Sequence, residues 1–135
     1  MMQTDPGAQY RRTQVLTAPP ERLVLMLYDR AVQLLEGVLA APDAGCGERR
    51  GKVAKVQEIL CELMCALDFR YEISWRLYRI YEYCYRRLAE SYVCRDADRV
   101  VEEVLGLVKE LRDAWSQAVQ ALGRGGGSGS PSVVS

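Results

Sequence analysis

Two cysteines in this chain have the spacing of metal ligands. Cys61 and Cys65 are four residues apart and would share one face of a helix. Zinc takes four ligands, however, and the chain contains no His to complete the set. We therefore expect no metal site and no cofactor. The predicted helices place Cys61, Cys65 and Cys84 on apolar faces, so we interpret them as buried residues of a reduced, cytosolic protein.

Carboxylates form a second group that could do chemistry. Glu102, Glu103 and Glu110 could in principle act as an acid and base pair or as a metal cluster. Basic side chains at positions 99, 109 and 112 alternate with them, a pattern typical of a solvated helix face with ion pairs three or four residues apart. Without His, the commonest general base near neutral pH is also missing, and no Gly-rich phosphate loop is present. We predict that the protein is not an enzyme.

Residues 75–87 are the third group, with four Arg interleaved among five aromatic residues. Aromatic rings beside cations can grip single-stranded nucleic acid without reading its sequence, so nucleic-acid binding is the alternative function. The chain has 18 basic and 18 acidic residues, and this neutral balance disfavours nucleic acid as a partner. It also provides no general attraction to an anionic membrane.

These residues belong to four predicted helices, at 19–41, 48–67, 72–93 and 97–122. Thr17 can cap the first helix, and a loop at 42–47 with one Pro and two Gly ends it. Short connections predict an all-α fold, an antiparallel up-down four-helix bundle. Residues 1–16 would form an N-terminal arm, residues 17–122 the bundle and residues 123–135 a disordered Gly/Ser tail. No signal peptide or membrane span is recognisable, so we expect the protein in the cytoplasm.

Each predicted helix carries an apolar row at steps of three and four, which would build the core. In the first helix this row is Leu23, Leu27, Ala31, Leu34 and Val38; in the third it is Ile73, Leu77, Ile80, Cys84 and Leu88; in the fourth it includes Trp115. The chain has more apolar positions than a four-helix core uses. A generously packed core, a homodimer seam or grooves for amphipathic helices of another protein would use the surplus. The groove candidates are Val24, Tyr28, Ile59, Met64, Tyr78, Tyr81 and Tyr85.

Five motifs in order resemble the flagellar export chaperone family. They are Tyr10 in the arm, residues 17–31 with Thr-Ala-Pro-Pro-Glu-Arg-Leu and Leu-Tyr-Asp-Arg-Ala, Leu-Asp-Phe at 67–69, Leu-Tyr-Arg-Ile-Tyr-Glu-Tyr at 77–83, and Glu-Leu-Arg-Asp-Ala-Trp at 110–115. The likeness covers about residues 8–122, and its specificity lies in the order and spacing of the motifs.

The resemblance implies a helical bundle that binds the disordered C-terminal segment of flagellin. The client would fold into helices in apolar grooves, which prevents premature polymerisation and aids export. Tyr10 would occupy a client site and be displaced on binding. An export-gate component and a second copy of this chain are left open as further partners.

Overall fold

The computed structural model describes residues 20–93 and 96–124. Within them the chain forms four helices and no strand: α2 (Pro20–Ala40), α3 (Cys46–Cys65), α4 (Glu72–Glu90) and α5 (Ala97–Arg124). This confirms the prediction of an all-α fold with four helices. The predicted arm, the proposed cap Thr17 and nearly all of the Gly/Ser tail lie outside the described residues. No helix of the described part is long and apolar enough to cross a bilayer.

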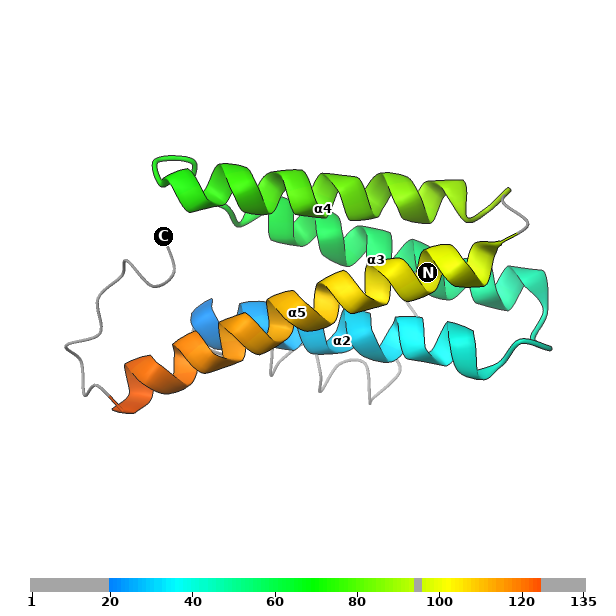
Figure 1. The fold of residues 1–135 in the computed structure, drawn as a ribbon, viewed down its shortest axis with the longest axis horizontal. Helices are drawn as coiled ribbons and strands as arrows, with labels where there is room; N and C mark the ends of the chain where they lie inside the picture. The colour runs from blue at the N-terminus through cyan, green and yellow to red at the C-terminus, as the bar shows by residue number, and fades with distance from the viewer. Residues whose placement is uncertain (1–19, 94–95, 125–135) are drawn as a thin grey trace, which may run out of the picture.

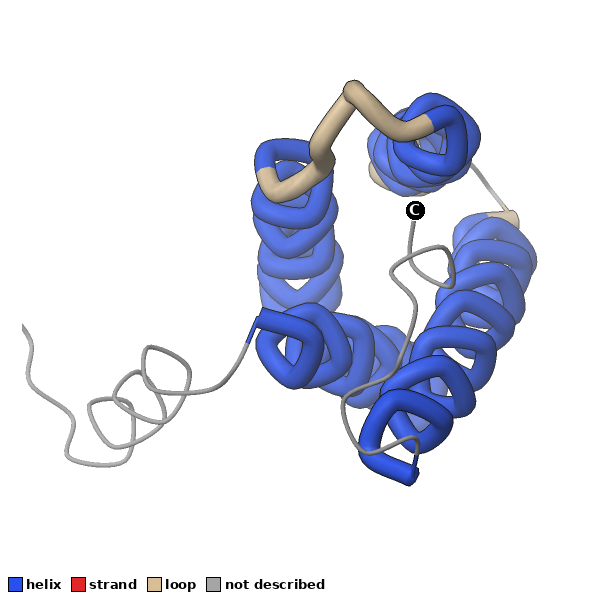
Figure 2. The backbone as a smooth tube through the Cα atoms, turned by 90° about the vertical axis from the view of Figure 1, so that its left-hand side faces the viewer, coloured by secondary structure: helices blue, strands red, loops and turns tan. Residues whose placement is uncertain are grey.

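The four helices lie around a common axis as a bundle (Figure 2). α2 packs against α3 and α5, and α4 closes the ring against the same two helices. Consecutive helices run in opposite directions along the long axis of the molecule (Figure 1). Consequently the start of α2, the end of α3, the start of α4 and the later half of α5 meet at one end of the bundle.

Local hydrogen bonds explain where the helices end. The connection between α3 and α4 contains neither Gly nor Pro, and the Asp68 carboxylate holds it by accepting a hydrogen bond from the Arg70 backbone N–H at 3.1 Å. The Asp68 carbonyl also accepts from the Tyr71 N–H at 3.2 Å. α4 ends earlier than predicted because the Ser91 hydroxyl donates to the Leu88 carbonyl at 2.6 Å, within a tighter turn.

The core differs from the predicted rows in α2 and α4. In α2 the buried residues include Tyr28 and Leu35, whereas Leu23, Leu27 and Leu34 are only half-buried. In α4 the buried row is Ser74, Tyr81, Cys84 and Leu88, and the predicted core residues Ile73, Leu77 and Ile80 are half-buried. Polar-tipped side chains therefore occupy core positions in both helices. Trp115 is half-buried, and its indole N–H donates to the Glu21 carbonyl at 2.7 Å, which joins α5 to the start of α2.

The predicted burial of the cysteines is correct for one of the three. Cys84 is fully buried, but Cys61 and Cys65 are exposed. The core face of α3 is formed by Val56, Ile59, Leu60 and Leu63, and Cys61 and Cys65 follow these positions on the outer face. Within residues 20–93 and 96–124, no three potential ligands gather in a way that could hold a metal ion.

Charged residues of α5 pair mainly with neighbouring helices. Within the described part of α5 only the adjacent residues Arg112 and Asp113 form an ion pair, and none of the predicted pairs three or four residues apart is present. Glu103 accepts from the Arg87 guanidinium of α4 at 2.9 Å. Lys109 lies 3.2 Å from the Glu36 carboxylate of α2. Because these side chains lie between helices, the pairs help to fix the arrangement of α5 in the bundle.

Candidate functional site

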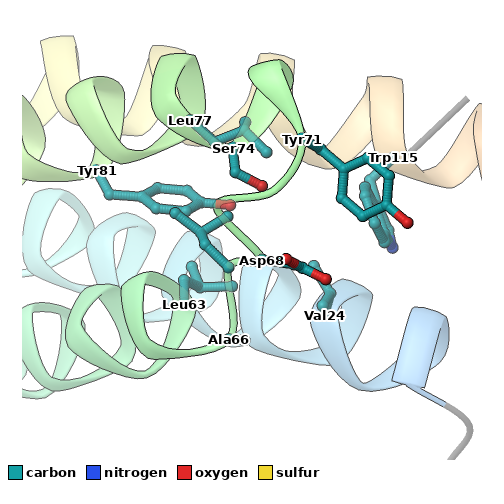
Figure 3. A pocket seen from close by; sticks show the side chains of 10 residues that line it. Val24, Leu63, Ala66, Asp68, Tyr71, Ser74, Leu77, Tyr81 and Trp115 are labelled. Atoms are coloured by element: carbon teal, nitrogen blue, oxygen red, sulfur yellow. The ribbon is translucent and has the colours of Figure 1, made fainter. Parts of the chain in front are cut away.

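A cavity opens at the end of the bundle where all four helices meet (Figure 3). Its volume is about 230 Å³. We call it the end cavity. Most of its lining is apolar, with a smaller polar set: Val24, Leu63, Ala66, Leu67, Leu77 and Trp115 are apolar, and Asp68, Tyr71, Ser74 and Tyr81 carry polar atoms. Mainly apolar lining with a few convergent polar groups is typical of a binding site.

The innermost polar group of the end cavity is fixed by a hydrogen bond across the bundle. The Tyr81 hydroxyl of α4 lies 2.5 Å from the Tyr28 hydroxyl of α2, and both side chains are buried. Burial raises the pKa of Tyr81, and the neighbouring Tyr28 raises it further. Burial also raises the pKa of Tyr28, although its hydrogen bond with Tyr81 works in the opposite direction. Both phenols are therefore neutral at physiological pH.

A negative charge lines the same cavity. The Asp68 carboxylate accepts hydrogen bonds from the Arg70 guanidinium, the shortest at 2.6 Å. These hydrogen bonds lower the pKa of Asp68 to about 2. The carboxylate is thus ionised at neutral pH, with part of its charge already balanced by Arg70.

Exposed aromatic rings lie next to this end of the bundle, in the α3–α4 connection and the first turns of α4. The ring centroid of Phe69 is 4.5 Å from that of Trp75 and 5.9 Å from that of Tyr78. All three side chains are exposed, with Trp75 at 52%. We call these three residues the aromatic patch. Clustered aromatic side chains on a surface are typical of protein interfaces.

Two of the four arginines of α4 are paired with carboxylates, whereas Arg76 and Arg79 are exposed. The Arg86 guanidinium is 2.9 Å from Glu82, and Arg87 binds both Glu90, at 2.5 Å, and Glu103. Tyr81 is buried, so it cannot stack with a base. These features provide a poor surface for nucleic acid.

Comparison with known protein families shows which family this chain belongs to. The model of the family described as flagellar protein FliS matches residues 2–122 of this chain. The chain belongs to the FliS family. It is accordingly a flagellar export chaperone and not an enzyme, and the resemblance inferred from the five motifs is confirmed.

Curated members of the FliS family share about a third of their residues with this chain. The flagellar secretion chaperone FliS of Bacillus subtilis (strain 168) is 34% identical over 118 residues, which cover 87% of this chain and 88% of the relative. The protein of the same name from Salmonella typhimurium (strain LT2) is 32% identical over 107 residues, which cover 76% and 78% of the two chains.

In this FliS-family chain the seven predicted groove residues fall into three environments. Val24 and Tyr81 line the end cavity. Tyr28, Ile59 and Tyr81 itself are buried in the core, which corrects their assignment to spare surface. Tyr28 can occupy the core because Tyr81 satisfies its hydroxyl. Met64 is half-buried, Tyr78 and Tyr85 are exposed, and Tyr10 lies outside the described residues.

Several residues at the end cavity of this FliS-family chain were not predicted as site residues. Ser74, Asp68 and Tyr71 were assigned to a helix start or to a connection, and Leu77 and Trp115 to the core. Two recognised motifs contribute to the cavity wall, however: Leu-Asp-Phe lies in the α3–α4 connection and Leu-Tyr-Arg lies in α4. The position of these motifs near the α3–α4 connection was therefore the sequence signal that could have indicated the cavity.

Proposed function

We propose that this flagellar export chaperone binds the C-terminal segment of flagellin and that the end cavity receives an anchoring part of the client. The observation that carries the proposal is an open, mainly apolar cavity built from all four helices of a FliS-family bundle. The client would be held in the cytoplasm, kept from premature polymerisation and delivered to the export apparatus.

Five of the predicted contacts remain available for this role. Val24 and Tyr81 would form the cavity wall, and Met64, Tyr78 and Tyr85 would contact the client over the outer face of the bundle. The aromatic patch extends the apolar surface beside the cavity. An amphipathic helix that seats a side chain in a pocket and lays its apolar face over neighbouring rings is a common mode of peptide recognition.

Coupled folding is the physical reason why such a client needs a chaperone. A disordered segment gains helix only when its apolar face is buried, and the ordering costs about 2–5 kcal/mol of the gross interaction energy. Apolar surface around the cavity would offset that cost. The complex should therefore form with a large negative heat-capacity change.

Calorimetric titration tests the proposed function. The probe is a peptide covering the C-terminal segment of a flagellin from the organism that makes this chain, titrated into the full chain at several temperatures and at low and high salt. We expect binding with a negative heat-capacity change and little dependence on salt. An absence of binding, or a steep loss of affinity with salt, would contradict the proposal.

Nucleic-acid binding through α4 is less well supported, because Arg86 and Arg87 are ion-paired and Tyr81 is buried. An export-gate component and a second copy of the chain remain proposals for additional partners. No feature of residues 20–93 and 96–124 favours either one.

A further inference from the structure

Two hydroxyl groups form the inner polar part of the end cavity. Tyr81 is 2% exposed and Ser74 is 5% exposed, and both line the cavity. Their oxygen atoms are directed toward the cavity (Figure 3). The backbone N–H of Ser74 donates to the Tyr71 carbonyl at 3.1 Å, but within the described residues the Ser74 hydroxyl has no hydrogen-bond partner.

The hydrogen atoms of the tyrosine pair show which groups are left to bind. Two hydroxyls carry two hydrogens, and the 2.5 Å contact between Tyr28 and Tyr81 uses only one of them. Tyr28 is 1% exposed and does not line the end cavity. Either hydroxyl can be the donor of this hydrogen bond. The Tyr81 hydroxyl therefore keeps either its hydrogen or a lone pair for a group bound in the cavity.

The end cavity is large for a water site. A single water needs roughly 10–15 Å³ of such volume, far less than the 230 Å³ present. The apolar wall formed by residues such as Leu63 and Leu77 offers water no hydrogen bonds. The volume and lining suit a side chain with an apolar stem and a polar tip.

The charges around the cavity restrict that polar tip. A carboxylate would meet the negative charge of Asp68. A cation would have to compete with Arg70 for Asp68 and would lose its own hydration. An uncharged amide matches all three groups. Its oxygen can accept from the Ser74 hydroxyl, its NH₂ can donate to Asp68, and either end can pair with the Tyr81 hydroxyl, which donates or accepts.

We propose that the end cavity binds an Asn or Gln side chain of the client, with the hydroxyls of Tyr81 and Ser74 as the groups that recognise its amide. The inference rests on the proposed function and adds a polar specificity determinant to an otherwise apolar surface. A client segment lacking the amide would leave these hydroxyls unpaired, and that is the source of discrimination.

A matched pair of variants separates recognition from folding. Tyr81→Phe and Tyr28→Phe both remove the same internal hydrogen bond, but only Tyr81→Phe removes the hydroxyl that lines the cavity. We expect Tyr81→Phe to weaken binding of the flagellin C-terminal peptide roughly three- to tenfold. Tyr28→Phe should bind within about twofold of the wild type, since the Tyr81 hydroxyl remains. Circular dichroism melts confirm that both variants are folded at the titration temperature.

Substitutions in the client identify the amide. Each Asn of the peptide is replaced by Leu and each Gln by Met, and the affinity is measured against the wild type and Tyr81→Phe. One replacement should weaken binding to the wild type and have little further effect on Tyr81→Phe, because both changes remove the same interaction.

Three results would overturn the proposal in distinguishable ways. If the wild type does not bind the peptide, the proposed function fails and this inference fails with it. If the wild type binds and the two Phe variants lose affinity equally, Tyr81 does not contact the client. If only Tyr81→Phe loses affinity but no Asn or Gln is coupled to it, the ligand is not an amide side chain.

Discussion

The Tyr28 and Tyr81 hydroxyls meet at 2.5 Å between α2 and α4, two helices that lie diagonally across the bundle. Both rings are buried, so this polar contact lies inside the core that holds the four helices together. It also places one hydroxyl at the inner surface of the end cavity. The same pair therefore contributes to the stability of the fold and to the polarity of the candidate site.

The tyrosine pair should make strongly non-additive contributions to stability. Tyr28→Phe or Tyr81→Phe alone leaves one buried hydroxyl without its partner, so each should lower the free energy of unfolding by about 1–3 kcal/mol. The double variant should lose less than the sum of the two, because both hydroxyls are removed together. Urea denaturation of the wild type, the two single variants and the double variant measures this coupling. Additive effects would show that the hydroxyls do not interact.

Alkaline pH should destabilise the protein through the same two residues. Their pKa values are raised above the ordinary value of 10.0 by burial, so the folded state keeps the two protons while the unfolded state releases them near pH 10. Their stabilising contribution is complete below pH 10 and is lost as pH rises toward the folded pKa values. Melting temperatures at increasing pH should fall more steeply for the wild type than for the double Phe variant. The exposed residue Tyr78 provides the control, since Tyr78→Phe should keep the wild-type slope.

The cysteines should differ sharply in reactivity. Cys61 and Cys65 are exposed and should be modified by a thiol reagent in the native state. Cys84 is buried, and burial raises the pKa of its thiol to about 12, so it should react only after unfolding. Mass spectrometry of peptides after brief labelling in the presence and absence of denaturant tests this order. Rapid labelling of Cys84 in the native state would contradict its burial and therefore the position of α4 in the bundle.

Unpaired arginines on α4 should contribute little to client binding. Arg76 and Arg79 are exposed, and no ion pair involves them within residues 20–93 and 96–124. The double variant Arg76→Ala with Arg79→Ala should bind the flagellin peptide within about threefold of the wild type, because surface charges are screened. A large loss of affinity that high salt reproduces would instead support an electrostatic partner, nucleic acid included.

Much of the fold could be predicted from the sequence because helix periodicity and helix ends are local signals. The apolar repeats and the Pro and Gly residues near 42–47 located the helices to within about three residues of where the structure has them. The α3–α4 connection was also located, although the Asp68 carboxylate that closes it acts through a hydrogen bond that composition does not reveal.

The candidate site was less predictable because its defining contacts are not local. Tyr28 and Tyr81 are 53 positions apart, so no periodicity could indicate that each satisfies the other and can be buried. For the same reason Tyr28 was predicted to lie in a surface groove and not in the core. The opposite error was made for Cys61 and Cys65, which were predicted to be buried but are exposed. The apolar face of the predicted helix is broad, so the sequence did not show where the buried side of the helix ends.

Two neighbouring apolar residues of α4 provide the most direct test of the end cavity as the client site. Leu77 and Ile80 are both half-buried, but only Leu77 lines the end cavity. The affinity of the flagellin C-terminal peptide is measured by calorimetry for the wild type, Leu77→Ala and Ile80→Ala, at a temperature where all three proteins are folded. We expect at least a roughly fivefold loss of affinity for Leu77→Ala and little change for Ile80→Ala. Equal affinities of the two variants would contradict the assignment of the end cavity as the client site.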